Sequence, residues 1–266
     1  MSKNVSTFEV DMTFQILSKA KAKEYKSLSS KKERDEKGLF LVEGEKCVRD
    51  TLVAFLPEAI ICTSGWKDSH PEFTEKWHDK IFLSDKKTLG IISSFSSVPE
   101  IIAVMKKPLP LKDIPKLKDN ELYLLLDELQ DPGNLGTIIR TCDWFGLYNI
   151  FASRNTVDVY SPKVVQSAMG SLSRVKVNYT DLAALIQDNR NLKVIGTLLD
   201  GEDINVADIK REGFLLMGNE GRGISPELKK FIDLPVTIPP VNKESHPDSL
   251  NVSIATAIVL SSICLK

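Results

Sequence analysis

The feature that most constrains the fold is a series of short apolar runs, separated by helix-like segments, that begins at residue 121. The first run, Leu122–Leu126 (LYLLL), has no charged position, which is typical of a parallel strand buried on both faces. Similar runs follow at Tyr148–Ala152, Val175–Val177, Val194–Leu198, Phe214–Met217 and Val236–Ile238. Helix-like segments cover Leu135–Phe145, Pro162–Met169, Asp181–Asn189, Pro226–Phe231 and Leu250–Cys264. This alternation predicts an α/β fold with a mostly parallel sheet and crossover helices.

The first 105 residues have the pattern of a smaller α/β unit. Its expected strands are Leu39–Val42, Ala59–Cys62, Ile81–Leu83 and Ile101–Met105, and its expected helices are Thr13–Ser29 and Gly44–Phe55. The segment 106–120 (KKPLPLKDIPKLKDN) contains three prolines and five lysines with little periodicity, which is typical of a linker. We therefore expect one domain at 1–105, a linker at 106–120 and a second domain at 121–266.

The composition excludes several classes of protein. With 42% hydrophobic and 27% charged residues, the chain is neither disordered nor fibrous. It has no apolar run of the roughly 18–20 residues that a membrane span needs. The first residues lack the basic-then-apolar order of a signal peptide, so we expect a cytoplasmic protein. The cysteines and histidines are scattered without metal-ligand spacing, and no metal site is predicted.

The charge is unevenly distributed along the chain. The net charge is −1, but residues 18–37 hold eight Lys or Arg against four Asp or Glu. This pattern fits both a solvated helix face and an arm that contacts phosphates, and the sequence leaves the two interpretations open. The candidate phosphate contacts are Lys19, Lys21, Lys31, Lys32 and Arg34.

Each of three polar segments follows one of the later strands and leads into a helix. The first, Asp131–Gly136 (DPGNLG), is a turn in which Gly133 and Gly136 permit close approach of a ligand to the backbone. In the helix that follows, Arg140 has apolar neighbours, so we expect it beside the core, where a guanidinium needs a partner. A structural ion pair would satisfy this need as well as a ligand would.

The second segment, Gly218–Gly223 (GNEGRG), has neither the GK[ST] ending of a P-loop nor the GxGxxG spacing of a dinucleotide site. Its exposed backbone groups suit an adenine edge or a carboxylate. The third segment places Ser249, Asn251 and Ser253 at a helix start, which favours anionic groups. A turn and a helix cap would explain each segment alone. Loops at strand ends of one sheet converge, however, so we expect a single ligand site.

These segments resemble the motifs of the SpoU (TrmH) family of the SPOUT superfamily, which are RNA ribose 2′-O-methyltransferases that use S-adenosylmethionine. The matching positions are Asn134, Gly136 and Arg140 for N-x-G-x-x-x-R, Gly218–Gly223 for G-N-E-G-x-G, and Ile238, Pro239 and Ser249–Val252 for I-P…S-L-N-V. The similarity covers residue 122 to the C-terminus. Residues 31–48 (KKERDEKGLFLVEGEKCV) also look like the ribosomal-protein-like RNA-binding module that many members carry.

The resemblance implies a SPOUT-type parallel sheet with a C-terminal trefoil knot, which general chain-topology rules would not suggest. It also implies a homodimer with each active site at or near the subunit interface. S-adenosylmethionine is the implied cofactor, and RNA, bound in part by the basic residues 19–34, is the implied partner. The implied cofactor-binding residues are Thr197, Leu198, Met217, Gly218, Asn219, Gly223, Ile238, Pro239 and Leu250.

Methyl transfer to a ribose 2′-oxygen needs in-line alignment and a route for the hydroxyl proton. Family proposals make the arginine at Arg140 the general base. A guanidinium rarely deprotonates, so we assign Arg140 to orienting the phosphate and stabilising the developing alkoxide. In this interpretation Glu220 accepts the proton or fixes Arg140. Positioning is the implied role of Asn134, Ser249 and Asn251.

Two departures from the family pattern and two alternatives accompany this interpretation. The segment 239–249 is longer than usual and lacks the usual glycine, and Gln166 stands where many members have arginine. The N-terminal module favours ribosomal RNA over transfer RNA as the substrate. A non-catalytic RNA-binding relative is the alternative function. A hydrolase or dehydrogenase would need a GxSxG, GxGxxG or histidine-centred pattern that this chain lacks.

Overall fold

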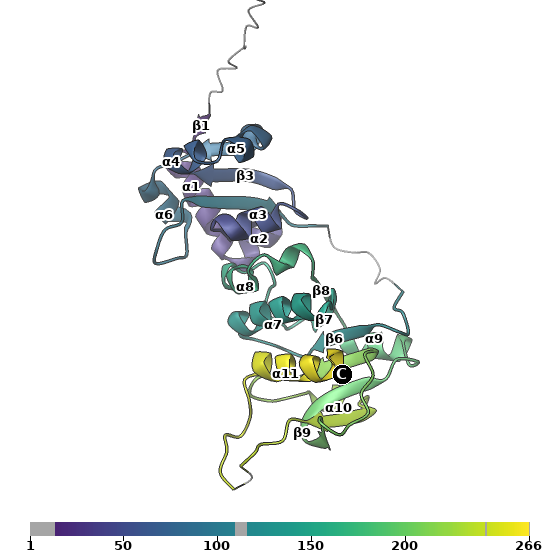
Figure 1. The fold of residues 1–266 in the computed structure, drawn as a ribbon. Helices are drawn as coiled ribbons and strands as arrows, with labels where there is room; N and C mark the ends of the chain where they lie inside the picture. The colour runs from purple at the N-terminus through teal and green to yellow at the C-terminus, as the bar shows by residue number, and fades with distance from the viewer. Residues whose placement is uncertain (1–13, 110–115, 243, 266) are drawn as a thin grey trace, which may run out of the picture.

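The computed structural model describes residues 14–109, 116–242 and 244–265. Within these ranges the chain forms two sheets, one built from residues before 107 and one from residues after 121 (Figure 1). The two sheets with their helices lie one above the other, and α8 (Pro162–Ala168) lies where they meet. No helix among the described residues is long and apolar enough to cross a membrane.

The first sheet has the strand order β1-β4-β3-β5-β2. Its strands are β1 (Gln15–Ile16), β2 (Leu39–Glu43), β3 (Pro57–Cys62), β4 (Ile81–Leu83) and β5 (Ile101–Lys106). Strand β5 is antiparallel to both of its neighbours, and the other pairs are parallel. The helices of this part are α1 (Lys19–Lys26), α2 (Lys31–Lys37), α3 (Glu45–Thr51), α4 (Ser64–Asp68), α5 (Pro71–Lys76) and α6 (Lys86–Ile92).

The first helix differs from the one expected over residues 13–29, whose first residue lies outside the described ranges. Strand β1 occupies part of that segment, and α1 begins only after Ser18, whose hydroxyl accepts a hydrogen bond from the N–H of Lys21 (3.1 Å). A second helix, α2, forms within the basic segment 18–37, beyond the helix expected over residues 13–29. It ends at Gly38, whose φ of 64° is the left-handed conformation that glycine adopts without strain.

The second sheet has the order β11-β9-β10-β6-β7-β8, and every neighbouring pair is parallel. The predicted α/β fold with a parallel sheet is therefore confirmed. Its strands are β6 (Leu122–Leu126), β7 (Asn149–Ser153), β8 (Lys176–Thr180), β9 (Val194–Asp203), β10 (Gly213–Met217) and β11 (Leu234–Thr237). Its further helices are α7 (Pro132–Phe145), α9 (Leu182–Asp188), α10 (Pro226–Lys229) and α11 (Val252–Cys264).

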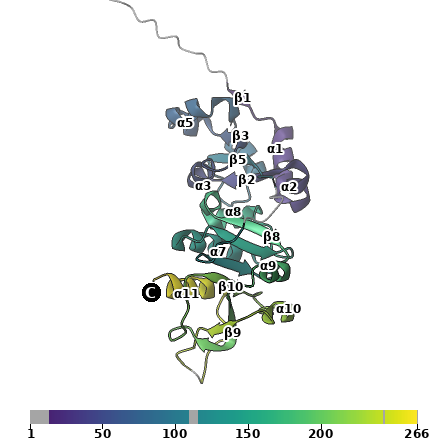
Figure 2. The same ribbon diagram turned by 90° about the vertical axis from the view of Figure 1, so that its right-hand side faces the viewer.

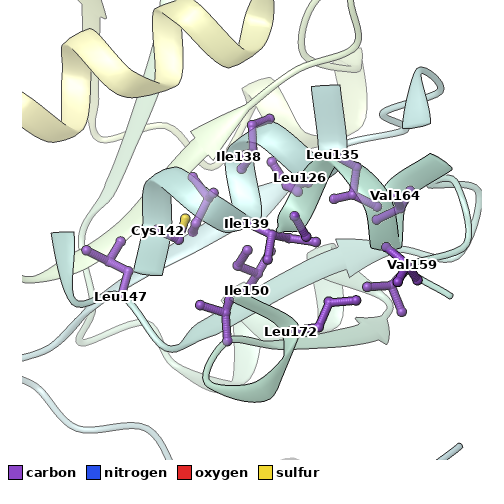
Figure 3. Packing of buried hydrophobic residues seen from close by; sticks show 14 of the residues in the cluster. Leu126, Leu135, Ile138, Ile139, Cys142, Leu147, Ile150, Val159, Val164 and Leu172 are labelled. Atoms are coloured by element: carbon purple, nitrogen blue, oxygen red, sulfur yellow. The ribbon is translucent and has the colours of Figure 1, made fainter. Parts of the chain in front are cut away.

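Strand β6 is buried along its whole length, as the apolar run predicts. Leu124 and Leu126 belong to the cluster that packs against α7, α8 and α11. Tyr123 and Leu125 belong to the cluster that packs against α9 and α10. Figure 3 shows the first of these clusters, in which Leu135, Ile138 and Ile139 of α7 lie over β6 and β7. Helices therefore cover both faces of this sheet, and the polar loops are left at its edges.

A buried ion pair joins the two halves of the molecule. Arg34 of α2 is 2% exposed, and its Nη2 lies 2.7 Å from Oδ2 of Asp158, which follows β7. Its Nη1 donates to the carbonyls of Leu28 and Ser29, each at 2.8 Å. The expectation that Arg34 contacts RNA phosphates is wrong, because its guanidinium is enclosed where the two halves of the molecule meet.

Candidate active site

The helix of the first polar segment begins earlier than expected. The sequence places its start at Leu135, but α7 starts at Pro132, and the carboxylate of Asp131 accepts the cap hydrogen bond from the N–H of Asn134 (2.8 Å). The side chain of Asn134 is thus free to contact other loops. Gly136, in the same turn, has no room for a side chain, because a Cβ atom there would lie 2.4 Å from Cβ of Ser167 on α8.

One chain of hydrogen bonds joins the three polar segments. The Nδ2 of Asn134 donates to Oε1 of Glu220 (3.1 Å) in the second segment. The Nδ2 of Asn251, in the third segment, donates to Oδ1 of Asn134 (3.0 Å). The Oδ1 of Asn251 caps α11 through the N–H of Ser253 (2.9 Å). Asn134 therefore sits between the other two side chains and fixes the distance between their loops.

The carboxylate of Glu220 is held by donors. Besides Asn134, it accepts hydrogen bonds from the backbone N–H groups of Gln130 (3.3 Å) and Asp131 (3.0 Å). Partial burial raises the pKa of Glu220, but these hydrogen bonds outweigh it and leave the pKa below its usual range. Among the described residues Glu220 forms no ion pair with Arg140. A carboxylate with occupied acceptors and a lowered pKa suits positioning better than proton acceptance.

Replacement of Glu220 by glutamine tests this assignment. The new amide group would face backbone N–H donors, so at least one hydrogen bond is lost and we expect methyl transfer to fall about tenfold to a hundredfold. The pH profile of the rate should keep its shape between about pH 6 and 9, because the pKa of Glu220 lies below that range. An ionisation that disappears from this range in Glu220→Gln would instead identify Glu220 as the proton acceptor.

The second segment is a tight turn with its own internal bonds. The backbone groups of Asn219 and Gly223 exchange two hydrogen bonds of 2.9 Å, and Gly223 has a φ of 66°. The Oδ1 of Asn219 accepts from the N–H groups of Gly221 (2.9 Å) and Arg222 (3.1 Å). A Cβ at Gly218 would lie 2.2 Å from the carbonyl carbon of Gly223, so only glycine fits at that position.

Glu128, which no motif in the sequence indicated, connects this turn to two other loops. Its carbonyl accepts from Nδ2 of Asn219 (2.7 Å), and its carboxylate accepts from Nη2 of Arg222 (2.9 Å) and from Nδ2 of Asn155 (2.9 Å) after β7. Its φ is 53°, a left-handed conformation that is strained for a residue with a side chain. An acidic residue two positions after a buried strand was the only signal in the sequence, and it did not indicate the partners of Glu128.

Arg140 lies in a different environment from the one expected. It is on the exposed side of α7, while Ile138 and Ile139 point into the core, and it has no hydrogen bond or ion pair with any residue in the described ranges. The expectation that it lies beside the core is wrong, because the apolar neighbours in sequence lie on another face of the helix. Four residues further along, Trp144 is 85% exposed. Arg140 thus presents an unpaired cation beside an exposed aromatic ring.

Apart from Leu250, which precedes α11, the residues expected to bind the cofactor lie on or after three neighbouring strands, β10, β9 and β11. The hydroxyl of Thr197 on β9 donates to the carbonyl of Leu216 (3.3 Å) and lies 3.5 Å from the sulfur of Met217 on β10. Between Pro235 and Val236 of β11 the pairing with β9 shifts and skips residues 197–201. These skipped residues include Leu198, and they lie outside the regular ladder at the end of the sheet.

Other predicted residues lie on the adjoining loop. Ile238 and Pro239 are half-buried just after β11, and Leu250 is 49% exposed just before α11. Ser249 is exposed and has no hydrogen bond within the described part of the chain, so the structure does not bring it together with Asn134 and Glu220. The polar edge formed by residues 197–201, 217–223 and 238–239 offers backbone groups and apolar side chains together, which fits an adenine nucleoside.

Comparisons with known proteins agree with this geometry. The family model described as "SpoU rRNA Methylase family" matches residues 121–261, and the model described as "MRM3-like substrate binding domain" matches residues 19–103. A curated relative from Bacillus subtilis, named 23S rRNA (guanosine(2553)-2′-O)-methyltransferase RlmP, is 32% identical over 247 residues. The match covers 90% of this chain and 94% of that protein.

Two solved structures have the same fold over nearly the whole chain. A putative RNA methyltransferase of the TrmH family from Porphyromonas gingivalis has a TM-score of 0.79 at 33% identity, covering 93% of this chain and 98% of that one. An rRNA methyltransferase from Sinorhizobium meliloti with bound AdoMet has a TM-score of 0.79 at 30% identity, covering 91% and 92%.

The fold, the strand-end loops and these similarities define an S-adenosylmethionine-dependent RNA methyltransferase of the SPOUT type. The three sequence motifs and the length of the match then identify the family within this class. The chain belongs to the SpoU rRNA methylase family.

Proposed function

We propose that this protein methylates a ribose 2′-oxygen of ribosomal RNA at the edge of the second sheet. The observation that carries the proposal is the hydrogen-bond chain from Glu220 through Asn134 to Asn251, which links all three motif segments. The choice of RNA substrate rests on the names of relatives. The Bacillus subtilis protein is named for a guanosine in 23S rRNA, and a protein from Streptomyces viridochromogenes, 25% identical, is named for a uridine in 23S rRNA. We propose 23S rRNA as the substrate.

In the proposed site, S-adenosylmethionine would supply an activated methyl group: the ribose 2′-oxygen forms a bond to the methyl carbon as its bond to sulfur breaks, S-adenosylhomocysteine leaves, and the hydroxyl proton passes to solvent. The backbone near Thr197, Gly218 and Ile238 binds it, with Leu198, Met217, Asn219, Gly223, Pro239 and Leu250 around it. Asn134 and Asn251 hold the loops at a fixed separation, which aligns the ribose for in-line attack. Arg140 binds the phosphate beside the target ribose and stabilises the developing alkoxide. Ser249 is free to contact the RNA.

The test is methyl transfer from labelled S-adenosylmethionine to ribosomal RNA from cells that lack this protein, followed by nucleoside mass spectrometry. A new 2′-O-methylnucleoside is expected, and the site to map first is the position for which the Bacillus subtilis relative is named. Transfer to tRNA alone would contradict the proposed substrate. Binding of the cofactor without transfer to any RNA would favour the non-catalytic alternative.

We further propose a homodimer formed through α7 and α11, helices that pack against each other. On α11, Ile254 and Ile258 are 51% and 38% exposed and lie four residues apart on one face. On α7, Trp144 is 85% exposed, and Arg140, four residues before it, is exposed as well. The dimer would cover these side chains and bring Arg140 to the subunit interface. Cytoplasmic location, the division at residues 106–120 and the trefoil knot stay predictions.

Ile254→Glu should dissociate this dimer. A charge at the centre of an apolar contact must be buried without a partner, which costs several kcal/mol. Light scattering should give a mass near twice 29.7 kDa for the natural chain and near 29.7 kDa for the variant. Val206→Glu, a control at another exposed apolar side chain, should leave the mass unchanged. A monomeric natural chain would contradict the proposed dimer.

A further inference from the structure

The described part of the chain has a cavity of about 570 Å³ beside the linker. It also has a second hollow, of about 560 Å³, in its N-terminal half. It lies between the end of α3 and helix α5. Leu52, Val53, Phe73 and Trp77 form its apolar lining, and Arg49 and Lys76 add cations. The guanidinium of Arg49 lies 5.0 Å from the ring centre of Phe73, and Nζ of Lys76 lies 5.5 Å from that of Trp77. The hollow thus combines aromatic rings with two cations, Arg49 and Lys76, and one carboxylate, that of Glu72.

The wall of this hollow is held in place by Glu45 at the start of α3. Its carboxylate accepts from Nε of Arg49 (2.9 Å) and from Nε1 of Trp66 (3.0 Å), and lies 3.3 Å from Nε2 of His70. The ring of His70 stacks on that of Trp66 at 4.2 Å. The hydrogen bond from Trp66, more than any other contact, holds the pKa of Glu45 below its usual range. The cavity wall is therefore fixed in position before a ligand arrives.

The basic residues of α1 and α2 that were expected to contact RNA are a weaker candidate for an RNA-binding site than this hollow. Lys21, Lys31 and Lys32 of α1 and α2 each form an ion pair with an acidic residue three or four positions further on, at 2.9, 2.6 and 3.8 Å. In the hollow, Arg49 pairs with Glu45 (2.9 Å), but Lys76 has no acidic partner among the described residues. Three of the four lysines expected to contact RNA are thus paired locally, whereas Lys19 has no ion pair among the described residues.

The position of the hollow also favours the hollow as an RNA-binding site. In Figure 2, α3 and α5 lie on the same side of the molecule as α7 and α11, whereas α1 and α2 lie on the other side. Helix α7 carries Asn134 at its start and Arg140 on its exposed face. An RNA segment bound between α3 and α5 therefore lies on the side of the chain that carries the candidate active site.

We propose that this hollow binds one unstacked nucleotide of the substrate RNA, with the base against the apolar lining and the phosphate near Lys76 and Arg49. Bases that are splayed out of RNA stack on aromatic side chains and on arginine, and their phosphates are held by cations. The proposal rests on the proposed function, since it takes RNA as the substrate. It assigns the binding of single-stranded RNA to α3 and α5 within residues 19–103, the part similar to a substrate binding domain.

The test measures binding of the full chain to transcribed 23S rRNA by filter retention. Val53→Glu places a negative charge at a side chain that is 82% exposed, so it should leave the fold intact and weaken binding about tenfold. Lys76→Ala should weaken it about threefold. Lys87→Ala, an exposed lysine on α6 with the same charge change, is the matched control and should bind within about twofold of the natural chain. Affinity for S-adenosylmethionine, measured by calorimetry, should not change in any variant.

A photocrosslink with RNA that contains 4-thiouridine provides a readout independent of activity. Crosslinked peptides are expected within residues 49–77. Crosslinks confined to residues 19–37, or a loss of affinity in a Lys31→Ala, Lys32→Ala double variant but not in Val53→Glu, would overturn the proposal. Should no RNA be methylated at all, the proposed function fails, while the crosslinks and affinities still decide whether the hollow binds RNA.

Discussion

Arg140→Lys should lower the rate of methyl transfer by about a hundredfold to a thousandfold, although the charge is kept. The guanidinium of Arg140 is exposed and has no partner in the described part of the chain, so its interactions are available for RNA. A planar fork can hold two phosphate oxygens at once, and an ammonium group offers only a point charge. The measurement is single-turnover transfer at saturating RNA, which separates the methylation step from binding.

The matched control is Arg154→Lys, which changes another exposed arginine on the loop after β7. It should retain most of the activity. The affinity of both variants for S-adenosylmethionine should equal that of the natural chain, because Arg140 lies on the outer face of α7 rather than on the strand ends proposed for the cofactor. Turnover of Arg140→Lys close to that of the natural chain would contradict the proposal that Arg140 binds the phosphate beside the target ribose and stabilises the alkoxide.

Arg34→Ala should lower the free energy of unfolding by about 3–5 kcal/mol, because it leaves the Asp158 carboxylate buried without its partner. The same change also removes two donors from the carbonyls of Leu28 and Ser29. The melting temperature should fall by roughly 10 °C, measured by calorimetry at neutral pH. Methyl transfer at low temperature, where the variant is still folded, should be much less affected.

A double variant separates the cost of an unpaired charge from the value of the pair itself. Arg34→Met combined with Asp158→Leu replaces both charges with apolar side chains of similar size, and should recover most of the lost stability. Arg34→Ala with unchanged stability would contradict the inference that this pair is buried between the two halves of the molecule.

Local patterns in the sequence were sufficient to predict the strands of the second sheet, but not their order. The apolar run Leu122–Leu126 is β6, residue for residue, and Ser161 and Ser225 immediately precede α8 and α10, as the Ser-Pro pairs indicate. These features depend on residues that are adjacent in the chain, so periodicity and capping rules apply to them. The predicted start of α7 was wrong by three residues: the helix was expected from Leu135, but Asp131 caps it and it begins at Pro132.

Features that depend on distant residues were not predictable in the same way. The φ of 53° at Glu128 is maintained by partners from loops at residues 155, 219 and 222, and no local pattern indicates those contacts. The burial of Arg34 depends on Asp158, which lies 124 positions away. Strand β9 runs five residues beyond the expected Leu198, because its pairing with β11 resumes after the shift at Pro235. In each case the determining contact is tertiary.

The joint between the two halves also constrains how such proteins can diversify. The Arg34–Asp158 pair and the ring contact of Phe40 with Tyr160 (4.8 Å) each take one partner from either side of the linker. A gene fusion that exchanged the first 105 residues for a foreign module would bring in a surface unmatched to Asp158 and Tyr160. Recombination at this point therefore demands compensating substitutions on both sides, and the N-terminal half and the catalytic half are expected to be inherited together.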